Sequence, residues 1–92
     1  MTMKHTLANL CLAEGVAFIH SCDETFVHFI ELGASDDSMC EYDFCDREGN
    51  TLFRVTADSN GDWLITVSVL MPVDPDEEEW EYIHTNQMEV TA

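Results

Sequence analysis

The middle of the chain, residues 39–70, alternates apolar and polar residues with a period of two between two turn signals, and this feature constrains the fold most. A period of two is typical of a β-strand with one buried face. We therefore predict three antiparallel strands, at about 39–45, 51–58 and 62–70. The side chains expected on the buried face are Cys40, Tyr42, Phe44, Phe53, Val55, Ala57, Trp63, Ile65 and Val67.

The second hairpin contains an Asn-Gly pair at residues 60–61, which is typical of a two-residue turn. That turn would place the apolar residues of the third predicted strand, such as Trp63, and those of the second, such as Val55, on opposite faces of the sheet. A three-residue loop at 59–61 pairs Val55 with Ile65 and keeps both sets on one face. We therefore predict the three-residue loop.

The first hairpin is predicted to have a four-residue loop at 47–50, because this length pairs Phe44 with Phe53 on the buried face. The same register places Asp43 opposite Arg54 on the outer face. A cross-strand pair of opposite charges contributes roughly 0.2–1 kcal/mol. One of the few basic side chains is thus expected to have a structural role.

The N-terminal flank predicts a helix at about 6–14. Thr6 is a suitable N-cap, apolar residues follow at helical spacing, and Gly15 is a suitable end. Residues 16–20 are then expected to form a short extended link or a further strand.

A second helix is predicted at about 22–32. Ser21 and Glu24 have the spacing of a capping box, and Gly33 could provide a left-handed C-cap. The alternation through residues 27–29 leaves a strand as the alternative.

A third helix is predicted at about 75–87. Asp74 is a good N-cap, Pro75 suits the first helical position, and carboxylates in the first turn complement the helix dipole. Alternation over residues 79–84 leaves a strand as the alternative here too.

The expected fold is therefore α+β, with a three-stranded antiparallel meander packed on one face by two or three helices. A chain of 92 residues can enclose one modest core, which predicts a single domain over residues 1–92. The apolar fraction of 46% is too high for a disordered acidic polypeptide.

Charge is the most unusual property of the composition. Nineteen Asp and Glu residues stand against three Lys and Arg residues, which gives a formal net charge of -16. This is about twice the upper end of the range that suits a small soluble domain. Nucleic acid and anionic membranes are poor direct partners, because their recognition depends on Lys and Arg. The charge indicates a positively charged protein surface as the partner.

Several kinds of chemistry find no support in the sequence. The four Cys and four His residues do not form the paired ligand spacings typical of zinc sites. The segment DSNGDW at 58–63 has its glycine at the fourth rather than the sixth position of a calcium loop. We therefore expect no metal, no cofactor and no enzymatic activity. Because no signal peptide or spanning segment is apparent, we also expect reduced cysteines and a cytoplasmic location. The chain is expected to be a monomer.

Two acidic blocks supply the predicted binding surface. One follows the second predicted helix and continues along the first predicted strand, and the other is the predicted C-terminal helix. On that helix, Glu78, Glu81 and Tyr82 would share the face directed away from Trp80 and Ile83, with neighbours about 5–6 Å apart. The predicted partner-binding residues are Asp36, Asp37, Glu41, Asp43, Asp76, Glu77, Glu78, Glu79, Glu81 and Tyr82.

In length, acidity and fold character, the chain resembles phage-encoded anti-CRISPR proteins, in particular inhibitors of type I-F surveillance complexes. The resemblance implies an inhibitor, located in the cytoplasm of a bacterial host, that occupies the basic nucleic-acid-binding surface of a bacterial defence complex and blocks the binding of target DNA. The alternative is an acidic protein-binding module, such as an immunity protein, antitoxin or adaptor, with a hydrophobic anchor.

Overall fold

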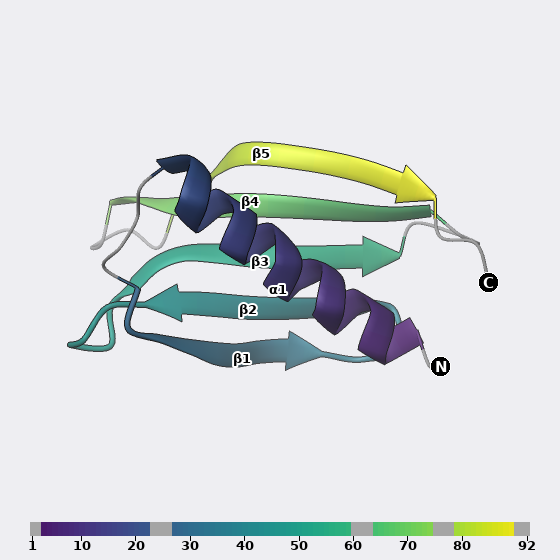
Figure 1. Cartoon of the computed structure of the whole chain (residues 1–92), viewed down its shortest axis with the longest axis horizontal. Coiled ribbons are helices and arrows are strands. Elements are labelled where there is room, and N and C mark those ends of the chain that lie inside the picture. Colours follow the sequence, from purple (N-terminus) through teal and green to yellow (C-terminus); the bar gives the residue numbers. More distant parts are fainter. Residues whose placement is uncertain (1–2, 23–26, 60–63, 75–78, 90–92) are drawn as a thin grey trace.

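The computed structural model describes residues 3–22, 27–59, 64–74 and 79–89. They form one helix followed by five strands (Figure 1). The elements are α1 (Met3–Cys22), β1 (Phe29–Ser35), β2 (Met39–Cys45), β3 (Thr51–Ser59), β4 (Leu64–Asp74) and β5 (Glu79–Glu89). The α+β class predicted from the sequence is confirmed, while the numbers of helices and strands differ from the prediction.

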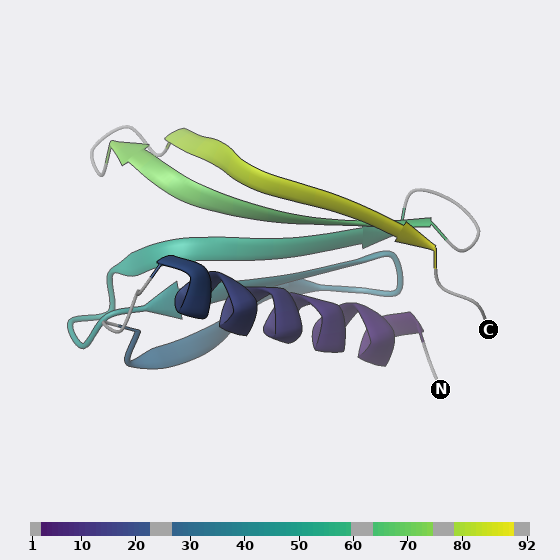
Figure 2. The same ribbon diagram turned by 45° about the horizontal axis from the view of Figure 1, so that its top comes forward.

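The five strands form one antiparallel sheet in the order β1-β2-β3-β4-β5, so that each strand pairs with its neighbours in the sequence. Helix α1 crosses one face of this sheet diagonally and packs on β2, β3 and β4 (Figures 1 and 2). No helix of the described residues covers the opposite face. We call the two faces the helix face and the outer face.

The core lies between α1 and the helix face. Phe44 stacks on Phe53 with ring centroids 4.6 Å apart, and Phe18 of α1 meets the edge of Phe53 at 4.7 Å. The buried cluster is Leu7, Cys11, Phe18, Cys40, Phe44, Phe53, Val55, Ala57, Ile65, Val67 and Val69. The predicted buried face is thus confirmed for seven of nine residues; Tyr42 is half-buried, and Trp63 lies outside the described residues.

The first hairpin follows the predicted register. Phe44 pairs with Phe53, and Asp43 pairs with Arg54. The register then shifts so that Cys45 pairs with Thr51, and the connection spans residues 46–50 instead of 47–50.

The register predicted for the second hairpin is wrong. Val55 pairs with Val69 instead of Ile65, and β4 extends to Asp74 instead of residue 70. The shift is four residues, which is even, so it leaves the same side chains on the helix face and also buries Val69 there. The alternating pattern determined the face and not the register. The turn residues 60–63 lie outside the described residues.

The predicted end of the first helix at residue 14 is also wrong, because α1 continues through Gly15 to Cys22. Gly15 is buried, and a β carbon at this position would lie 2.0 Å from Cζ of Phe44. The glycine therefore permits close approach of the helix to the sheet. Residues 16–20, predicted as a link or a strand, are helical and bring Phe18 into the core.

The second predicted helix, 22–32, does not form. Cys22 is the last residue of α1, residues 23–26 lie outside the described residues, and residues 29–32 belong to β1, which pairs with β2. Ser21 lies in the last turn of α1, where its Oγ donates to the carbonyl oxygen of Phe18 at 3.0 Å. Gly33 is a strand residue, and Gly49 is the described glycine with a positive φ. Pairing with β2 therefore outweighed the local helix signals, as the strand alternative allowed.

The prediction of a third helix at 75–87 is also wrong, because strand pairing again outweighed the local helix signals. Residues 79–89 form β5, which pairs with β4 along its length, and residues 75–78 lie outside the described residues. Asp74 ends β4 and pairs with Glu79 instead of capping a helix. The alternation over 79–84 was the correct signal.

Candidate partner-binding surface

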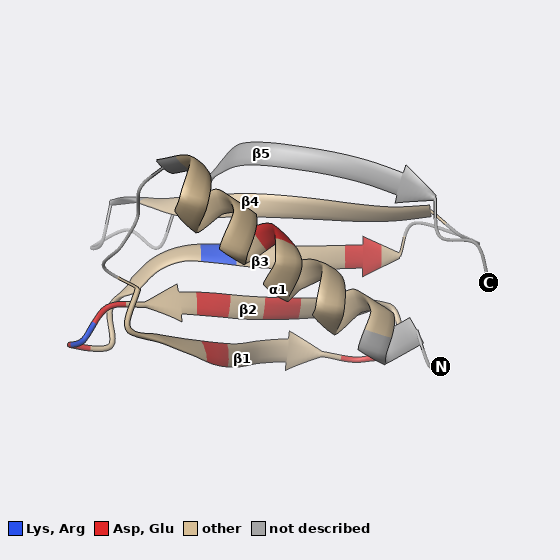
Figure 3. Ribbon diagram, in the orientation of Figure 1, with Lys and Arg blue, Asp and Glu red and all other residues tan. Residues whose placement is uncertain are grey.

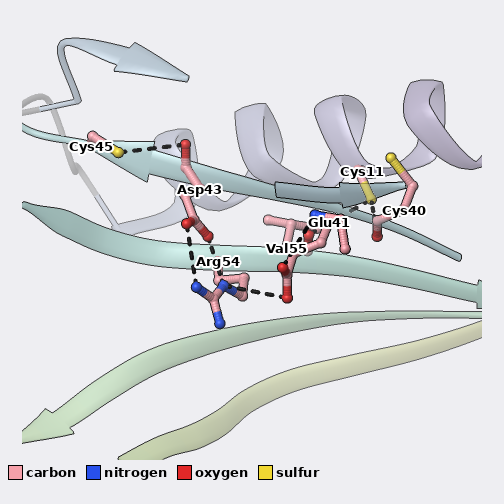
Figure 4. A network of polar contacts seen from close by, with 8 residues as sticks. Cys11, Cys40, Glu41, Asp43, Cys45, Arg54 and Val55 are labelled. Atoms are coloured by element: carbon pink, nitrogen blue, oxygen red, sulfur yellow. Dashed lines mark hydrogen bonds and ion pairs between the residues drawn. The ribbon is translucent and has the colours of Figure 1, made fainter. Parts of the chain in front are cut away.

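Two of the predicted binding residues, Glu41 and Asp43, lie on the outer face of β2, as expected from their alternation with buried Cys40 and Phe44. Arg54 of β3 lies opposite them (Figure 4). Its Nε is 2.6 Å from Oδ1 of Asp43 and 3.4 Å from Oε1 of Glu41, and its Nη2 donates to Oδ2 of Asp43 at 3.3 Å. The three side chains form one ion-pair cluster.

This cluster is partly shielded from water. The side chains of Arg54, Glu41 and Asp43 retain 26%, 22% and 17% of their accessible surface. The hydrogen bond with Asp43 raises the pKa of Arg54 above its usual value, against the opposing effect of burial. The Arg54 guanidinium therefore already neutralises part of the charge that the sequence predicts for partner binding, and these two carboxylates are not free.

Asp36 and Asp37 lie in the turn between β1 and β2, and both are exposed. Oδ1 of Asp36 accepts hydrogen bonds from the backbone N–H of Ser38 at 2.7 Å, from its Oγ at 2.9 Å and from the N–H of Met39 at 3.0 Å. Asp36 therefore stabilises the turn, as aspartate commonly does. Asp37 makes no such contact among the described residues and projects its charge from the turn.

The remaining predicted residues belong to the C-terminal acidic block. Asp76, Glu77 and Glu78 lie outside the described residues. Glu79, Glu81 and Tyr82 belong to β5, where Glu81 is the register partner of Met71 and Tyr82 that of Leu70. Residues 79–89 are a strand, so the helix on which Glu81 and Tyr82 were predicted to share a face is absent there. Of the predicted residues whose side chains the structure describes, Glu41 and Asp43 lie together on β2, whereas Asp36 and Asp37 lie in the turn before it.

The surface of β1, which stands at the end of the strand order, was not predicted from the sequence. Phe29, Ile30 and Leu32 retain 39%, 43% and 57% of their accessible surface. Three large apolar side chains within four residues are thus exposed on one strand. The alternation through residues 27–29 was the available signal, but an edge position follows only from the order of strands, which the sequence did not reveal.

The pairing of β1 with β2 assigns these side chains to faces. Ile30 pairs with Phe44 and Leu32 with Tyr42, so both lie on the helix face, beyond the area on which α1 packs. Glu31 pairs with Asp43 on the outer face and is exposed. Regular pairing ends in a bulge between Leu32 and Ser35.

Exposed carboxylates surround this strand (Figure 3). Glu31 lies within it, Asp36 and Asp37 follow in the turn, and Glu48 lies in the loop between β2 and β3 together with Arg47. We define the β1 edge as the surface of Phe29, Ile30, Glu31, Leu32, Asp36 and Asp37. It combines an apolar strip with negative charge.

The cysteines whose side chains are described are free, buried thiols: Cys11, Cys40 and Cys45. Sγ of Cys11 donates to the carbonyl oxygens of Cys40 and Val55 at 3.4 and 3.7 Å (Figure 4). Burial raises the pKa of Cys11 to about 12 and also raises that of Cys45. Thiols that are enclosed in this way are poor nucleophiles, so these side chains act in packing.

Within the described ranges, no three His, Cys, Asp or Glu side chains are grouped to hold a metal ion. The one described helix is not long and apolar enough to cross a membrane. No family model matches the chain, and no curated protein and no solved structure is significantly similar to it. The function is therefore inferred from the surface itself.

Proposed function

We propose that this protein is a small acidic protein-binding module that recognises a positively charged protein through the β1 edge. The observation that carries the proposal is the exposure of Phe29, Ile30 and Leu32 on an edge strand surrounded by carboxylates. A single exposed apolar residue is ordinary, whereas Ile30 and Leu32 are neighbours on one face, with Phe29 on the other face and carboxylates around them. An apolar patch with a polar rim is typical of an interaction site.

The two components of this surface have different roles. An exposed ion pair contributes only about 0.2–1 kcal/mol, so charge alone gives little affinity at each contact. Burying an exposed apolar side chain of this size contributes up to about 1.5–3 kcal/mol, which makes Ile30 and Leu32 the natural anchors. The net charge of -16 accelerates association with a basic partner and makes it sensitive to salt.

A second candidate function is inhibition of a bacterial defence complex, such as a CRISPR effector, by occupying its basic nucleic-acid-binding surface and blocking target DNA. The net charge and the exposed carboxylates Glu31, Asp37 and Glu48 favour it. The ion pairs of Arg54 with Glu41 and Asp43 weigh against these two carboxylates as mimics of phosphates. We therefore favour the binding module with a hydrophobic anchor over the inhibitor.

The test begins with capture of partners from a nuclease-treated bacterial lysate on the immobilised chain, at low and high salt. Each captured protein is identified, purified and titrated against variants. The double variant Ile30→Thr/Leu32→Thr should bind at least about tenfold more weakly, because about 1.4 kcal/mol of lost apolar burial already gives that factor. Val16→Thr is the matched control, because Val16 is similarly exposed, at 47%, but lies on α1.

Competition with nucleic acid separates the two candidate functions. If saturating target nucleic acid displaces the protein while Ile30→Thr/Leu32→Thr binds normally, the protein is an inhibitor that competes with nucleic acid, and the proposed hydrophobic anchor is wrong. If the double variant loses binding and nucleic acid does not compete, the binding module is correct. Binding that withstands high salt and every one of these changes contradicts both.

A further inference from the structure

We propose that the partner binds by adding a strand to β1, and that this strand alternates apolar residues with Lys or Arg. The proposal rests on the proposed function, since it specifies how a positively charged protein would be recognised. It concerns an interaction surface of defined geometry and defines the sequence pattern that fits it.

The position of β1 supplies the backbone part of the site. Among the described strands, β1 pairs on one side only, with β2. An edge strand presents a row of backbone N–H and C=O groups to any extended segment placed beside it. Regular pairing with β2 covers Phe29 to Leu32, and the bulge that follows ends the straight portion. The added strand therefore has about four residues of β1 with which to pair.

The side chains of β1 determine which segment fits. Ile30 and Leu32 point to the helix face, and they are 43% and 57% exposed. Glu31, between them in the sequence, points to the outer face beside Asp43. Directly opposite side chains of neighbouring strands interact across about 4.5–5.5 Å. The added strand should therefore carry apolar residues opposite Ile30 and Leu32 and a Lys or Arg opposite Glu31.

The ion-pair cluster on β2 and β3 leaves Glu31 available for this contact. Arg54 already binds Asp43 and Glu41, while the Glu31 carboxylate has no hydrogen bond or ion pair with another described residue. Glu41 is also directed toward β1, where its Oε2 accepts from the backbone N–H of Ala34 at 3.5 Å. The acidic group left for a ligand on the straight part of β1 is therefore Glu31.

Charge selects a basic partner over a second copy of this chain. Two copies would each bring a net charge of -16 and would place their Glu31 side chains against the same acidic surface. Like charges on neighbouring strands are destabilising. The turn residues Asp36 and Asp37, at the end of the strand, extend the negative field that a Lys- or Arg-containing segment would meet.

A synthetic peptide of alternating valine and lysine is the probe, and binding to the full chain is followed by NMR titration and amide hydrogen exchange. We expect shifts across residues 29–32, slowed exchange at those of their amides that point away from β2, and little change in α1. A peptide of alternating valine and glutamate should not bind. A valine-lysine peptide with methylated backbone nitrogens should also fail, because it cannot form the ladder.

Charge reversal provides the sharpest comparison. Glu31→Lys should weaken binding of the valine-lysine peptide at least about tenfold and create binding of the valine-glutamate peptide. Asp58→Lys is the matched control, since it makes the same charge change at an exposed position of β3 and should have little effect.

Three results would overturn strand addition: binding that survives backbone methylation, equal losses in Glu31→Lys and Asp58→Lys, or concentration-dependent dimers in sedimentation that exclude the peptide. The first two would leave a basic partner in place and change only its mode of binding. The proposed function fails separately, if no captured protein depends on Ile30 and Leu32.

Discussion

The substitution Gly15→Ala tests how α1 packs on the sheet. Alanine normally stabilises the interior of a helix relative to glycine by about 0.8–1.0 kcal/mol. In this chain, however, the added β carbon would lie 2.0 Å from Cζ and 2.6 and 2.7 Å from the Cε atoms of Phe44. Carbon atoms in optimal contact are about 3.5–4.0 Å apart, so the helix or the ring would have to move by about 1.5 Å.

The ring has little room for this movement. Phe44 is fully buried, and Phe53 stacks against it with centroids 4.6 Å apart and an interplanar angle of 12°. Overpacking a core costs about 1–3 kcal/mol or more, and the overlap here corresponds to the upper part of that range. After subtraction of the gain in helix propensity, we expect Gly15→Ala to lower the free energy of unfolding by about 1–2 kcal/mol.

Equilibrium urea unfolding measures this loss. Ala13→Gly, at an exposed position of the same helix, calibrates the propensity effect and should lower stability by about 1 kcal/mol. Phe44→Leu removes the ring that Gly15 contacts, so the double variant Gly15→Ala/Phe44→Leu should be more stable than the sum of the single losses predicts, with a coupling of about 0.5–3 kcal/mol. A gain of about 1 kcal/mol for Gly15→Ala alone would refute the packing argument.

Two further predictions concern the polar groups near the core. Arg54→Met leaves the half-buried carboxylates of Asp43 and Glu41 without their cation, so it should lower the free energy of unfolding, measured with urea, by about 1–3 kcal/mol. The triple variant that adds Asp43→Asn and Glu41→Gln should recover most of this loss. A change within about 0.5 kcal/mol for Arg54→Met would contradict this prediction. The Cys11 thiol has its pKa raised from 9.0 to about 12, so the unfolded chain loses this proton first as the pH rises. The contribution of Cys11 to the free energy of unfolding is complete below pH 9 and should fall between pH 9 and 12 by up to about 1.4 kcal/mol per pH unit. In thermal unfolding, the stability of Cys11→Ala should therefore fall less steeply with pH than that of the unmodified chain. Equal slopes for the two proteins would contradict the raised pKa of Cys11.

The central hairpins show what an alternating pattern can predict. The bounds of β2 and the pairing of Phe44 with Phe53 followed from matching the buried faces. The register between Val55 and Ile65 did not, because a shift of four residues buries the same face equally well. The two registers differ in which β4 residue lies opposite each β3 residue, and that choice depends on contacts that no local pattern contains.

The flanking segments were mispredicted because local helix signals competed with long-range pairing. Ser21, Gly33 and Asp74 have the chemistry of helix caps, yet they lie in the last turn of a helix, in an edge strand and at the end of a strand. Local propensities amount to about 1 kcal/mol or less per residue, which is easily outweighed when a strand completes a sheet. Gly15 was misread for a related reason, since a glycine needed for close approach resembles one that ends a helix.

The same long-range effect explains the outcome for the candidate site. Sequence reasoning correctly placed Glu41 and Asp43 on the outer face and paired Asp43 with Arg54. It could not predict that Arg54 would also lie within 3.4 Å of Glu41, because that contact requires the actual side-chain geometry. The exposed apolar strip on β1 was missed because exposure of Ile30 and Leu32 depends on which strand forms the edge.

The diagonal course of α1 connects the fold to the proposed function. One helix is too narrow to cover five strands, and it packs on β2, β3 and β4. The apolar residues that β1 places on the helix face therefore remain exposed, while the equivalent residues of β2 and β3 are buried apart from half-buried Tyr42. Natural proteins usually protect such an edge with lysine or proline, whereas β1 carries Glu31 between its apolar residues. A carboxylate discourages pairing between acidic copies and still favours a basic strand, so it gives the edge selectivity for the partner that the net charge of the chain attracts.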